Sequence, residues 1–391
     1  MAEPDAPLPF AVFQNEIYLA GMAGEVPAIP LTPAGLEARA AQLLSADAFG
    51  YVAGGAGAES TAAANRAALD RVGLVPRHLR GVATCSLAVE LFGQTLQAPV
   101  MLAPVGALGI VHAEAELGVA AAATAAGVPF ILSTLSSNPL EVVAGAAGNL
   151  PRWFQLYWPR DPEICASLVQ RAGAAGYGAI VLTVDTGQLA WRPRDLEHGF
   201  LPFLRGEGIA NYLTDPVFRS QLPVPPEEDP RPAIARWVEV FANPALAWAD
   251  LPRLRELTRL PVLLKGILHA DDARRAIEAG IDGLIVSNHG GRQVDGSIGA
   301  LDALAGVVAA AGEAPVLFDG GIRTGSDALK ALALGARAVL LGRPYAYALG
   351  IGGSETLTAF LRGFLAELEI TMALCGLRSI AEVGPELLEA G

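Results

Sequence analysis

Short apolar segments alternate with alanine-rich stretches along most of this chain, and this alternation constrains the fold more than any other feature. Segments that are apolar on both faces are typical of parallel strands covered by helices outside and by packed side chains inside. The intervening stretches have helical periodicity and close on glycine. Such a series predicts an α/β protein with a single closed (β/α)8 TIM barrel. The predicted strands cover residues 100–104, 130–133, 153–157, 179–185, 262–266, 283–287, 316–319 and 338–342.

An open doubly wound sheet is the alternative architecture. It would carry a G-x-G-x-x-G turn after an early strand, and this sequence has none. We therefore predict a barrel over residues 99–391, with residues 1–98 as an N-terminal helical cap segment at its bottom or side, integral to the barrel domain. Residues 186–249 follow the fourth strand, are rich in proline, and are expected to form a lid insertion over the active face.

Composition limits the partners of the protein. A net charge of −13 argues against nucleic acid or an anionic membrane surface. No window has eighteen uninterrupted apolar residues, and the first residues lack the basic and apolar regions of a signal peptide. Three widely spaced cysteines show no metal-ligand spacing, so we expect reduced thiols and no metal site. These features are typical of a cytoplasmic enzyme.

Polar and ionisable side chains stand where the predicted strands end. Chemistry in barrels of this kind occurs at the C-terminal ends of the strands. If these polar residues had only structural roles, they would be distributed along the sequence or lie on helix faces exposed to water. The strand interiors here are nearly devoid of charge. The pattern predicts one active site built from several strands. Its residues include Ser133, Gln155, Tyr157, Thr183, Asp185, Lys265, Ser287, His289, Asp319, Gly342 and Arg343.

Residues 287–292, with the sequence SNHGGR, carry the most informative group of side chains. The imidazole of His289 titrates near neutral pH and is suited to act as a base. The Arg292 guanidinium presents two parallel donors that match a carboxylate. Gly290 and Gly291 allow close approach of a ligand and positive φ. A helix-capping turn is the alternative for this segment alone, but the other strand ends favour a catalytic terminus.

Two glycine-rich turns at the last strand ends indicate a phosphate site. Asp319, Gly320 and Gly321 lead to Arg323, and Gly342 precedes Arg343. Backbone N–H groups, a helix N-terminus and guanidinium groups together bind phosphate. Because the sequence has no nucleoside-triphosphate loop, we expect a phosphorylated cofactor.

Taken in order, these motifs resemble those of the FMN-dependent (S)-2-hydroxy acid oxidase and dehydrogenase family. The resemblance covers the chain from about residue 16 to its end and rests on YVAGG (51–55), AP (103–104), FQLY (154–157), TVDT (183–186), LKG (264–266), SNHGGR (287–292), DGGIR (319–323) and GRP (342–344). Within the family the chain is most similar to the lactate 2-monooxygenase branch. Residues 15–18, 191–195, 202–206 and 211–218, the long insertion and Gly106 support that branch.

The resemblance implies a role for each residue type around an FMN cofactor. His289 would take a proton from the substrate, with Asp185 offsetting the charge that it gains. Lys265 would lie at the N1/O2 edge of the flavin and stabilise its reduced form. The substrate carboxylate and hydroxyl would be bound by Tyr51, Tyr157, Arg192 and Arg292. The remaining cofactor contacts would come from Ala103, Pro104, Val105, Ser133, Gln155, Thr183, Ser287, Asp319, Gly320, Gly321, Arg323, Gly342 and Arg343.

The reaction that the resemblance implies is oxidation of a lactate-like L-2-hydroxy acid with O2, followed by monooxygenase-type decarboxylation to a shorter acid. A simple oxidase that releases 2-keto acid and H2O2, or a dehydrogenase with another electron acceptor, is the alternative. A flavin-binding scaffold without turnover is a third hypothesis. Leu135 stands where glycolate oxidase has tryptophan, and Gly187 stands where the lactate 2-monooxygenase branch has a bulkier residue; both changes enlarge the pocket and favour a substrate larger than lactate. The family also implies a homotetramer or homo-octamer.

Overall fold

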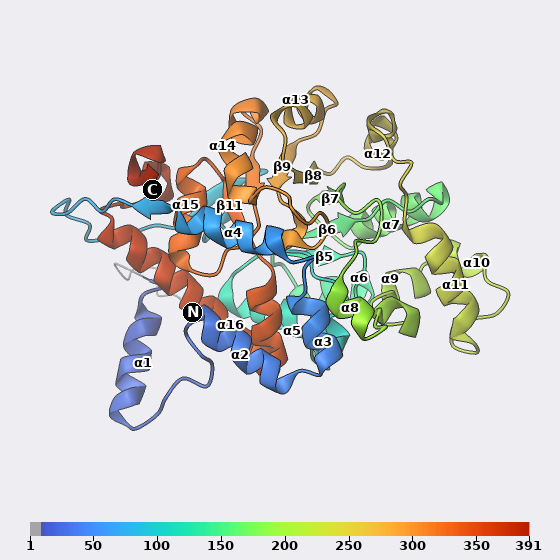
Figure 1. Cartoon of the computed structure of the whole chain (residues 1–391), viewed down its shortest axis with the longest axis horizontal. Coiled ribbons are helices and arrows are strands. Elements are labelled where there is room, and N and C mark those ends of the chain that lie inside the picture. The colour runs from blue at the N-terminus through green and yellow to red at the C-terminus, as the bar shows by residue number, and fades with distance from the viewer. Residues whose placement is uncertain (1–8, 391) are drawn as a thin grey trace.

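The computed structural model describes residues 9–390. Residues 1–8 and 391, which include the residues behind the signal-peptide prediction, lie outside this range. The predicted TIM barrel is confirmed, because eight parallel strands close in the order β10-β11-β4-β5-β6-β7-β8-β9. Figure 1 shows the strands at the centre with helices around them. The barrel strands are β4 (Val100–Leu102), β5 (Phe130–Ser133), β6 (Arg152–Leu156), β7 (Ile180–Thr183), β8 (Val262–Ile267), β9 (Gly283–Val286), β10 (Val316–Phe318) and β11 (Ala338–Leu341).

Helices connect the strands and cover the outside of the barrel. They are α5 (Ala115–Ala126), α6 (Leu140–Ala147), α7 (Pro162–Ala174), α12 (Leu251–Leu257), α13 (Ala270–Glu278), α14 (Ala300–Ala311), α15 (Gly325–Ala333) and α16 (Arg343–Leu374). Their ends follow local chemistry. The Asp161 carboxylate accepts the Glu163 N–H at 3.0 Å and so caps α7. Gly127 ends α5 at φ +67, a left-handed conformation that favours glycine. α16 is interrupted at Gly352 and Gly353.

A hairpin closes the N-terminal end of the barrel. β2 (Val89–Leu91) and β3 (Gln94–Leu96) pair antiparallel, and their apolar residues pack against the inward-facing residues of the barrel strands. The Phe92 ring meets the Trp153 ring edge-on with centroids 5.6 Å apart. The hairpin therefore covers this end of the barrel with apolar side chains.

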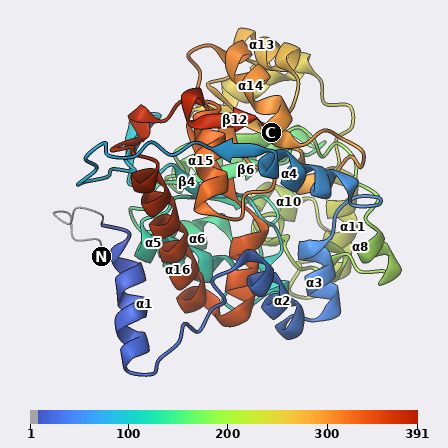
Figure 2. The ribbon, with the colours of Figure 1, turned by 60° about the vertical axis from the view of Figure 1, so that its left-hand side comes forward.

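The N-terminal segment does more than cover the bottom or side of the barrel. α1 (Val12–Met22) and α2 (Pro33–Leu43) lie beside α16, as Figure 2 shows. α3 (Ala46–Ala53) and α4 (Ser60–Asp70) instead reach the C-terminal mouth, because the Asn65 amide donates to the Asn288 side chain at 2.8 Å and the Ala56 N–H donates to the Gly291 carbonyl at 2.9 Å. The expected position at the bottom or side is thus wrong for α3 and α4.

Residues 186–249 contain helices rather than an irregular loop. They include α8 (Pro193–Glu197), α9 (Ala210–Leu213), α10 (Pro216–Ser220) and α11 (Pro230–Phe241). Prolines begin α8, α10 and α11, where the fixed φ suits a helix start and no N–H is needed. The proline-rich composition therefore marks helix N-termini. Within residues 9–390, no helix is both long and apolar enough to cross a membrane.

Short elements complete the fold. β1 (Val72–Leu74) pairs antiparallel with β12 (Leu388–Ala390) and so joins the C-terminal end of the described chain to the segment that follows α4. The 3-10 turns are η1 (Leu108–Ile110), η2 (Pro202–Arg205), η3 (Trp248–Asp250), η4 (His289–Gly291), η5 (Ile380–Glu382) and η6 (Pro385–Leu387).

Candidate active site

A cavity opens at the C-terminal mouth of the barrel. All but four of the predicted site residues line it: Tyr51, Ala103, Pro104, Val105, Ser133, Tyr157, Arg192, Lys265, His289, Arg292, Asp319, Gly320, Gly321, Arg323, Gly342 and Arg343. The other four lie one contact behind the lining. Gln155 accepts from Ser133, Ser287 accepts from Lys265, Thr183 pairs with Lys265 in the sheet, and Asp185 bonds His289. The structure therefore brings the predicted residues together.

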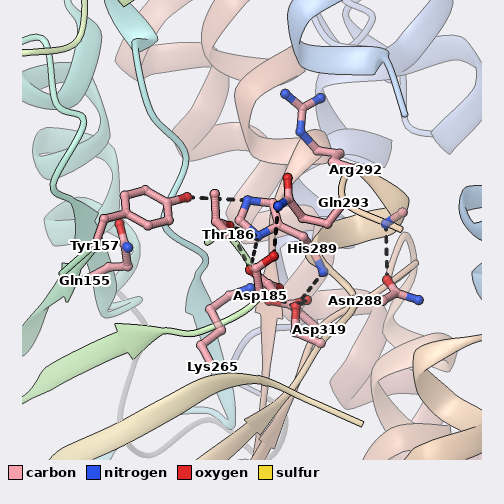
Figure 3. A network of polar contacts seen from close by, with 12 residues as sticks. Gln155, Tyr157, Asp185, Thr186, Lys265, Asn288, His289, Arg292, Gln293 and Asp319 are labelled. Carbon is pink, nitrogen blue, oxygen red and sulfur yellow. Dashed lines mark hydrogen bonds and ion pairs between the residues drawn. The ribbon is translucent and has the colours of Figure 1, made fainter. Parts of the chain in front are cut away.

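The imidazole of His289 lies between a carboxylate and a phenol (Figure 3). Its Nδ1 is 2.8 Å from Asp185 Oδ1, and its Nε2 is 3.5 Å from the Tyr157 hydroxyl. The Thr186 hydroxyl donates to the same Asp185 oxygen at 2.8 Å. His289 has a φ of +57, a strained conformation for a residue with a side chain. Strain of this kind persists at positions where the surrounding contacts fix the backbone.

Burial and neighbouring charges tune this pair. Burial lowers the pKa of His289, although the Asp185 carboxylate opposes the shift; Lys265 and Arg192 lower it further. Burial by itself would raise the pKa of Asp185, but the charge and hydrogen bond of His289, together with Lys265 and Thr186, outweigh burial and lower it. At neutral pH the site therefore holds a neutral imidazole beside an ionised carboxylate.

Lys265 belongs to a buried network of hydrogen-bonded polar side chains with Ser287 and Asp319. Its ammonium lies 3.0 Å from Asp319 Oδ2 and donates to the Ser287 hydroxyl at 2.7 Å. Ser287 donates onward to Asp319 Oδ1 at 2.5 Å and accepts the His289 backbone N–H at 3.0 Å. Lys265 is 4% exposed, so it is not a snorkelling surface lysine. These contacts fix the Lys265 ammonium in the lining of the cavity, close to the backbone of His289.

Two guanidinium groups, those of Arg192 and Arg292, face the cavity near His289. Arg292 donates from Nη1 to the carbonyls of Tyr51 and Gly54 at 2.6 and 2.7 Å, and its guanidinium lies over the Tyr51 ring. Arg192 donates from Nε to the Arg292 carbonyl at 3.1 Å. Burial, Arg192 and Arg343 lower the pKa of Arg292 to about 9. The guanidinium stays charged at neutral pH but lies among like charges.

Arg323 and Arg343 form a second basic group at the other end of the cavity. Burial and the charge of Arg343 lower the pKa of Arg323 to about 10. Arg343 donates to the Gly290 carbonyl at 2.8 Å and to the Gly54 carbonyl at 3.0 Å. Over residues 9–390, none of the four arginines forms an ion pair with a carboxylate. Buried guanidiniums without acidic partners are suited to bind anionic ligands.

Orphaned polar atoms test whether a flavin nucleotide fits here. The Gln155 amide nitrogen and the Thr183 hydroxyl are buried, and neither has a hydrogen-bond partner in the described part of the chain. Buried donors are normally satisfied, so each calls for a polar ligand edge at the mouth of the barrel. Gly320 and Gly321, at φ +121 and +100, line the cavity with backbone beside Arg323 that could bind a phosphate. The residues present fit a phosphorylated, planar, polar-edged cofactor such as FMN.

Several lining residues were not predicted from the sequence. Phe203 and Phe241 come from the insertion, and the Phe241 ring meets the Tyr157 ring edge-on at 5.3 Å. The Phe203 ring also lies edge-on to Tyr51 at 6.2 Å. Gln293 does not itself line the cavity but accepts a hydrogen bond from Arg192, and it was not predicted although it directly follows Arg292. Gln293 could have been predicted because it directly follows the SNHGGR motif. No nearby motif in the sequence indicates that Phe203 and Phe241 line the cavity.

Comparison with known proteins agrees with this geometry. The family model for FMN-dependent dehydrogenases matches residues 40–390. The chain is 45% identical over 381 residues to the FMN-dependent alpha-hydroxy acid dehydrogenase qulF of Penicillium citrinum, covering 96% of this chain and 95% of that protein. It is 44% identical over 367 residues to an L-lactate oxidase of Lysinibacillus sphaericus, covering 94% of each. A crystal structure of mandelate oxidase superimposes with a TM-score of 0.81 at 40% identity, covering 92% of this chain and 98% of that one. The chain belongs to the FMN-dependent dehydrogenase family, and its cofactor is FMN.

Proposed function

We propose that this protein oxidises an L-2-hydroxy acid of the lactate type and uses O2 as the electron acceptor. One observation carries the proposal: a neutral, carboxylate-paired imidazole faces the same cavity as two buried guanidiniums that have no acidic partner. A 2-hydroxy acid needs both groups, because one end is a carboxylate and the adjacent carbon bears the hydroxyl to be oxidised. Relatives named L-lactate oxidase and 4-hydroxymandelate oxidase support this reading.

Binding of the carboxylate orients the substrate. Arg192 and Arg292 supply charged donors, and Tyr51 and Tyr157 also line the cavity. Burial raises the pKa of both tyrosines, so they stay protonated and available as donors. A substrate fixed by its carboxylate has its α-carbon held near His289, which removes much of the entropic cost of reaching the reactive geometry.

Proton removal falls to His289. Its Nδ1 is bonded to Asp185, so Nε2 is the nitrogen left to take a proton. The low pKa keeps the imidazole neutral before reaction, and the ionised Asp185 stabilises the imidazolium that forms. When bound, FMN supplies the two-electron acceptor for the α-carbon. Lys265, fixed by Asp319 and Ser287, supplies positive charge in the lining of the same cavity.

The insertion contributes residues to the cavity that influence which of two sets of products is released. In the simple oxidase reaction, the hydroxy acid and O2 give a 2-keto acid and H2O2. In the monooxygenase-type reaction, H2O2 attacks the keto acid before release, giving a carboxylic acid one carbon shorter, CO2 and water. The apolar lining formed by Phe203 and Phe241 of the insertion, together with Leu135, supports retention of product and hence the second reaction. The names of the relatives support the first.

The test begins with anaerobic flavin reduction by a panel of L-2-hydroxy acids that runs from lactate to larger apolar members. We expect bleaching of the flavin absorbance with at least one, and no bleaching with any would overturn the proposal. Products are then identified in air. A shortened acid with little free H2O2 indicates the monooxygenase reaction, whereas 2-keto acid with stoichiometric H2O2 indicates the oxidase. Size-exclusion chromatography with light scattering tests the predicted tetramer or octamer.

A further inference from the structure

We propose that Gln293 is a positioning residue that holds Arg192 in the orientation needed to bind the substrate carboxylate. The inference rests on the proposed function and adds a residue to it. Gln293 lies outside the direct lining of the cavity, and its amide joins the carboxylate-binding group to the backbone of the residue that orients the base.

Three hydrogen bonds define the position of Gln293. Its Oε1 accepts from Arg192 Nη2 at 2.9 Å. Its Nε2 donates to the carbonyl of Asp185 at 2.8 Å and to the carbonyl of Gln188 at 3.2 Å. One planar amide therefore ties together the end of β7, the start of the insertion and the side chain of Arg192. Figure 3 shows Gln293 beside His289 and Asp185.

Arg192 needs such a restraint. It stands at the N-cap of the short helix α8 and has a long side chain that forms no ion pair within residues 9–390. The contacts to Gln293 and to the Arg292 carbonyl use Nη2 and Nε, which leaves Nη1 for a ligand. Arg192 is 7% exposed, so the restraint acts in a buried setting where its hydrogen bonds are strong. A side chain fixed in advance loses less conformational entropy when the ligand binds.

The amide suits this task better than a carboxylate would. An amide oxygen orients the guanidinium but leaves its charge intact for the substrate. A carboxylate at the same place would pair with Arg192 and compete with the substrate carboxylate. Asp185 gains from the same amide, since the bond to its carbonyl fixes the backbone from which its side chain reaches His289.

The test compares Gln293→Met with a matched control, Gln221→Met. Methionine keeps the length of the side chain and removes its hydrogen bonds. Gln221 forms the same kind of bridge on the surface, accepting from Arg236 at 2.8 Å and donating to Asp161 at 3.0 Å. The probe is oxalate, which presents a carboxylate but has no C–H bond to oxidise, and its binding is followed through the flavin absorbance of the FMN-loaded protein.

For Gln293→Met we expect the oxalate Kd and the substrate KM to rise about tenfold, with kcat falling less than about threefold and FMN content unchanged. Gln221→Met should match the wild type in all four. Gln293→Glu should bind oxalate more weakly than Gln293→Met at pH 8. At lower pH the introduced carboxyl is protonated, and the affinity of Gln293→Glu for oxalate should then approach that of Gln293→Met.

Two results would overturn the inference: an oxalate Kd for Gln293→Met within twofold of the wild type, or equal losses in Gln293→Met and Gln221→Met. Both are distinct from failure of the proposed function. If the proposed function fails, no hydroxy acid bleaches the flavin of the wild-type protein. A wild type that is bleached, together with a Gln293→Met variant that binds oxalate normally, rejects the role of Gln293 alone.

Discussion

Asp185 and His289 meet through a single contact, 2.8 Å between Oδ1 and Nδ1, and this contact decides which imidazole nitrogen is basic. A carboxylate accepts, so Nδ1 carries the proton and Nε2 faces the Tyr157 hydroxyl with a free lone pair. The two residues come from the ends of β7 and β9, which are separated in the barrel by β8.

Asp185→Asn should lower kcat by about 10²- to 10⁴-fold, because an amide can donate to Nδ1 and favour the wrong tautomer, and because it no longer stabilises the imidazolium. Rapid-reaction measurement of flavin reduction checks this. FMN content and melting temperature serve as controls and should stay near those of the wild type. A loss in kcat below threefold would contradict the role of Asp185.

The pH profile of kcat/KM should rise with pH through a midpoint below 6.5, the ordinary value for histidine, and then level off. The base must be unprotonated, and burial lowers the pKa of His289. Since Asp185 raises the pKa of His289, Asp185→Asn should move the midpoint to still lower pH. A midpoint above 7 in the wild type would show that the carboxylate outweighs burial.

Lys265→Met should lower the free energy of unfolding by about 3–5 kcal/mol, because the buried Asp319 carboxylate loses its cation. Urea denaturation measures the change. Adding Asp319→Asn removes the stranded charge and should restore most of the stability, whereas flavin reduction by substrate stays slow. If activity returns together with stability, Lys265 has only a structural role.

Arg323→Met should weaken the affinity of the apoprotein for FMN by about tenfold or more while leaving the affinity for riboflavin unchanged, because only FMN has a phosphate. Fluorescence titration with the two flavins measures both. Arg343 is less suitable for this test, since it also donates to carbonyls of Gly290 and Gly54. Equal losses for FMN and riboflavin would place Arg323 away from the phosphate.

Gly291→Ala should destabilise the protein by about 2 kcal/mol or more and slow flavin reduction. An added Cβ would lie 2.5 Å from the Ala62 backbone nitrogen, and φ is +77. Gly187→Ala is the control, because its Cβ would lie 3.6 Å from the Pro244 Cα and no positive φ is involved. Thermal melts of the two variants should differ by several degrees, and similar melts would contradict the close packing of η4 on α4.

The sequence by itself determined the barrel and the strand ends that carry the chemistry. Burial of apolar segments follows local patterns, so the series of apolar segments predicted the strands β4 to β11. Lys265 lies near the C-terminal end of β8, and His289 and Asp319 follow the ends of β9 and β10, so the same series also located these three residues. The glycine-rich turns were equally local, because backbone freedom at Gly320 and Gly321 depends on residue type.

Only the tertiary structure decided which distant segments complete the site. Phe203 and Phe241 line the cavity although they come from the insertion, and Asn65 of α4 bonds Asn288 although the two residues are 223 positions apart in the chain. The bridge from Gln293 to Arg192 and Asp185 likewise exists only once the barrel has closed. Such contacts depend on which loops lie next to one another in the folded protein. The periodicity of residues along one segment does not predict them.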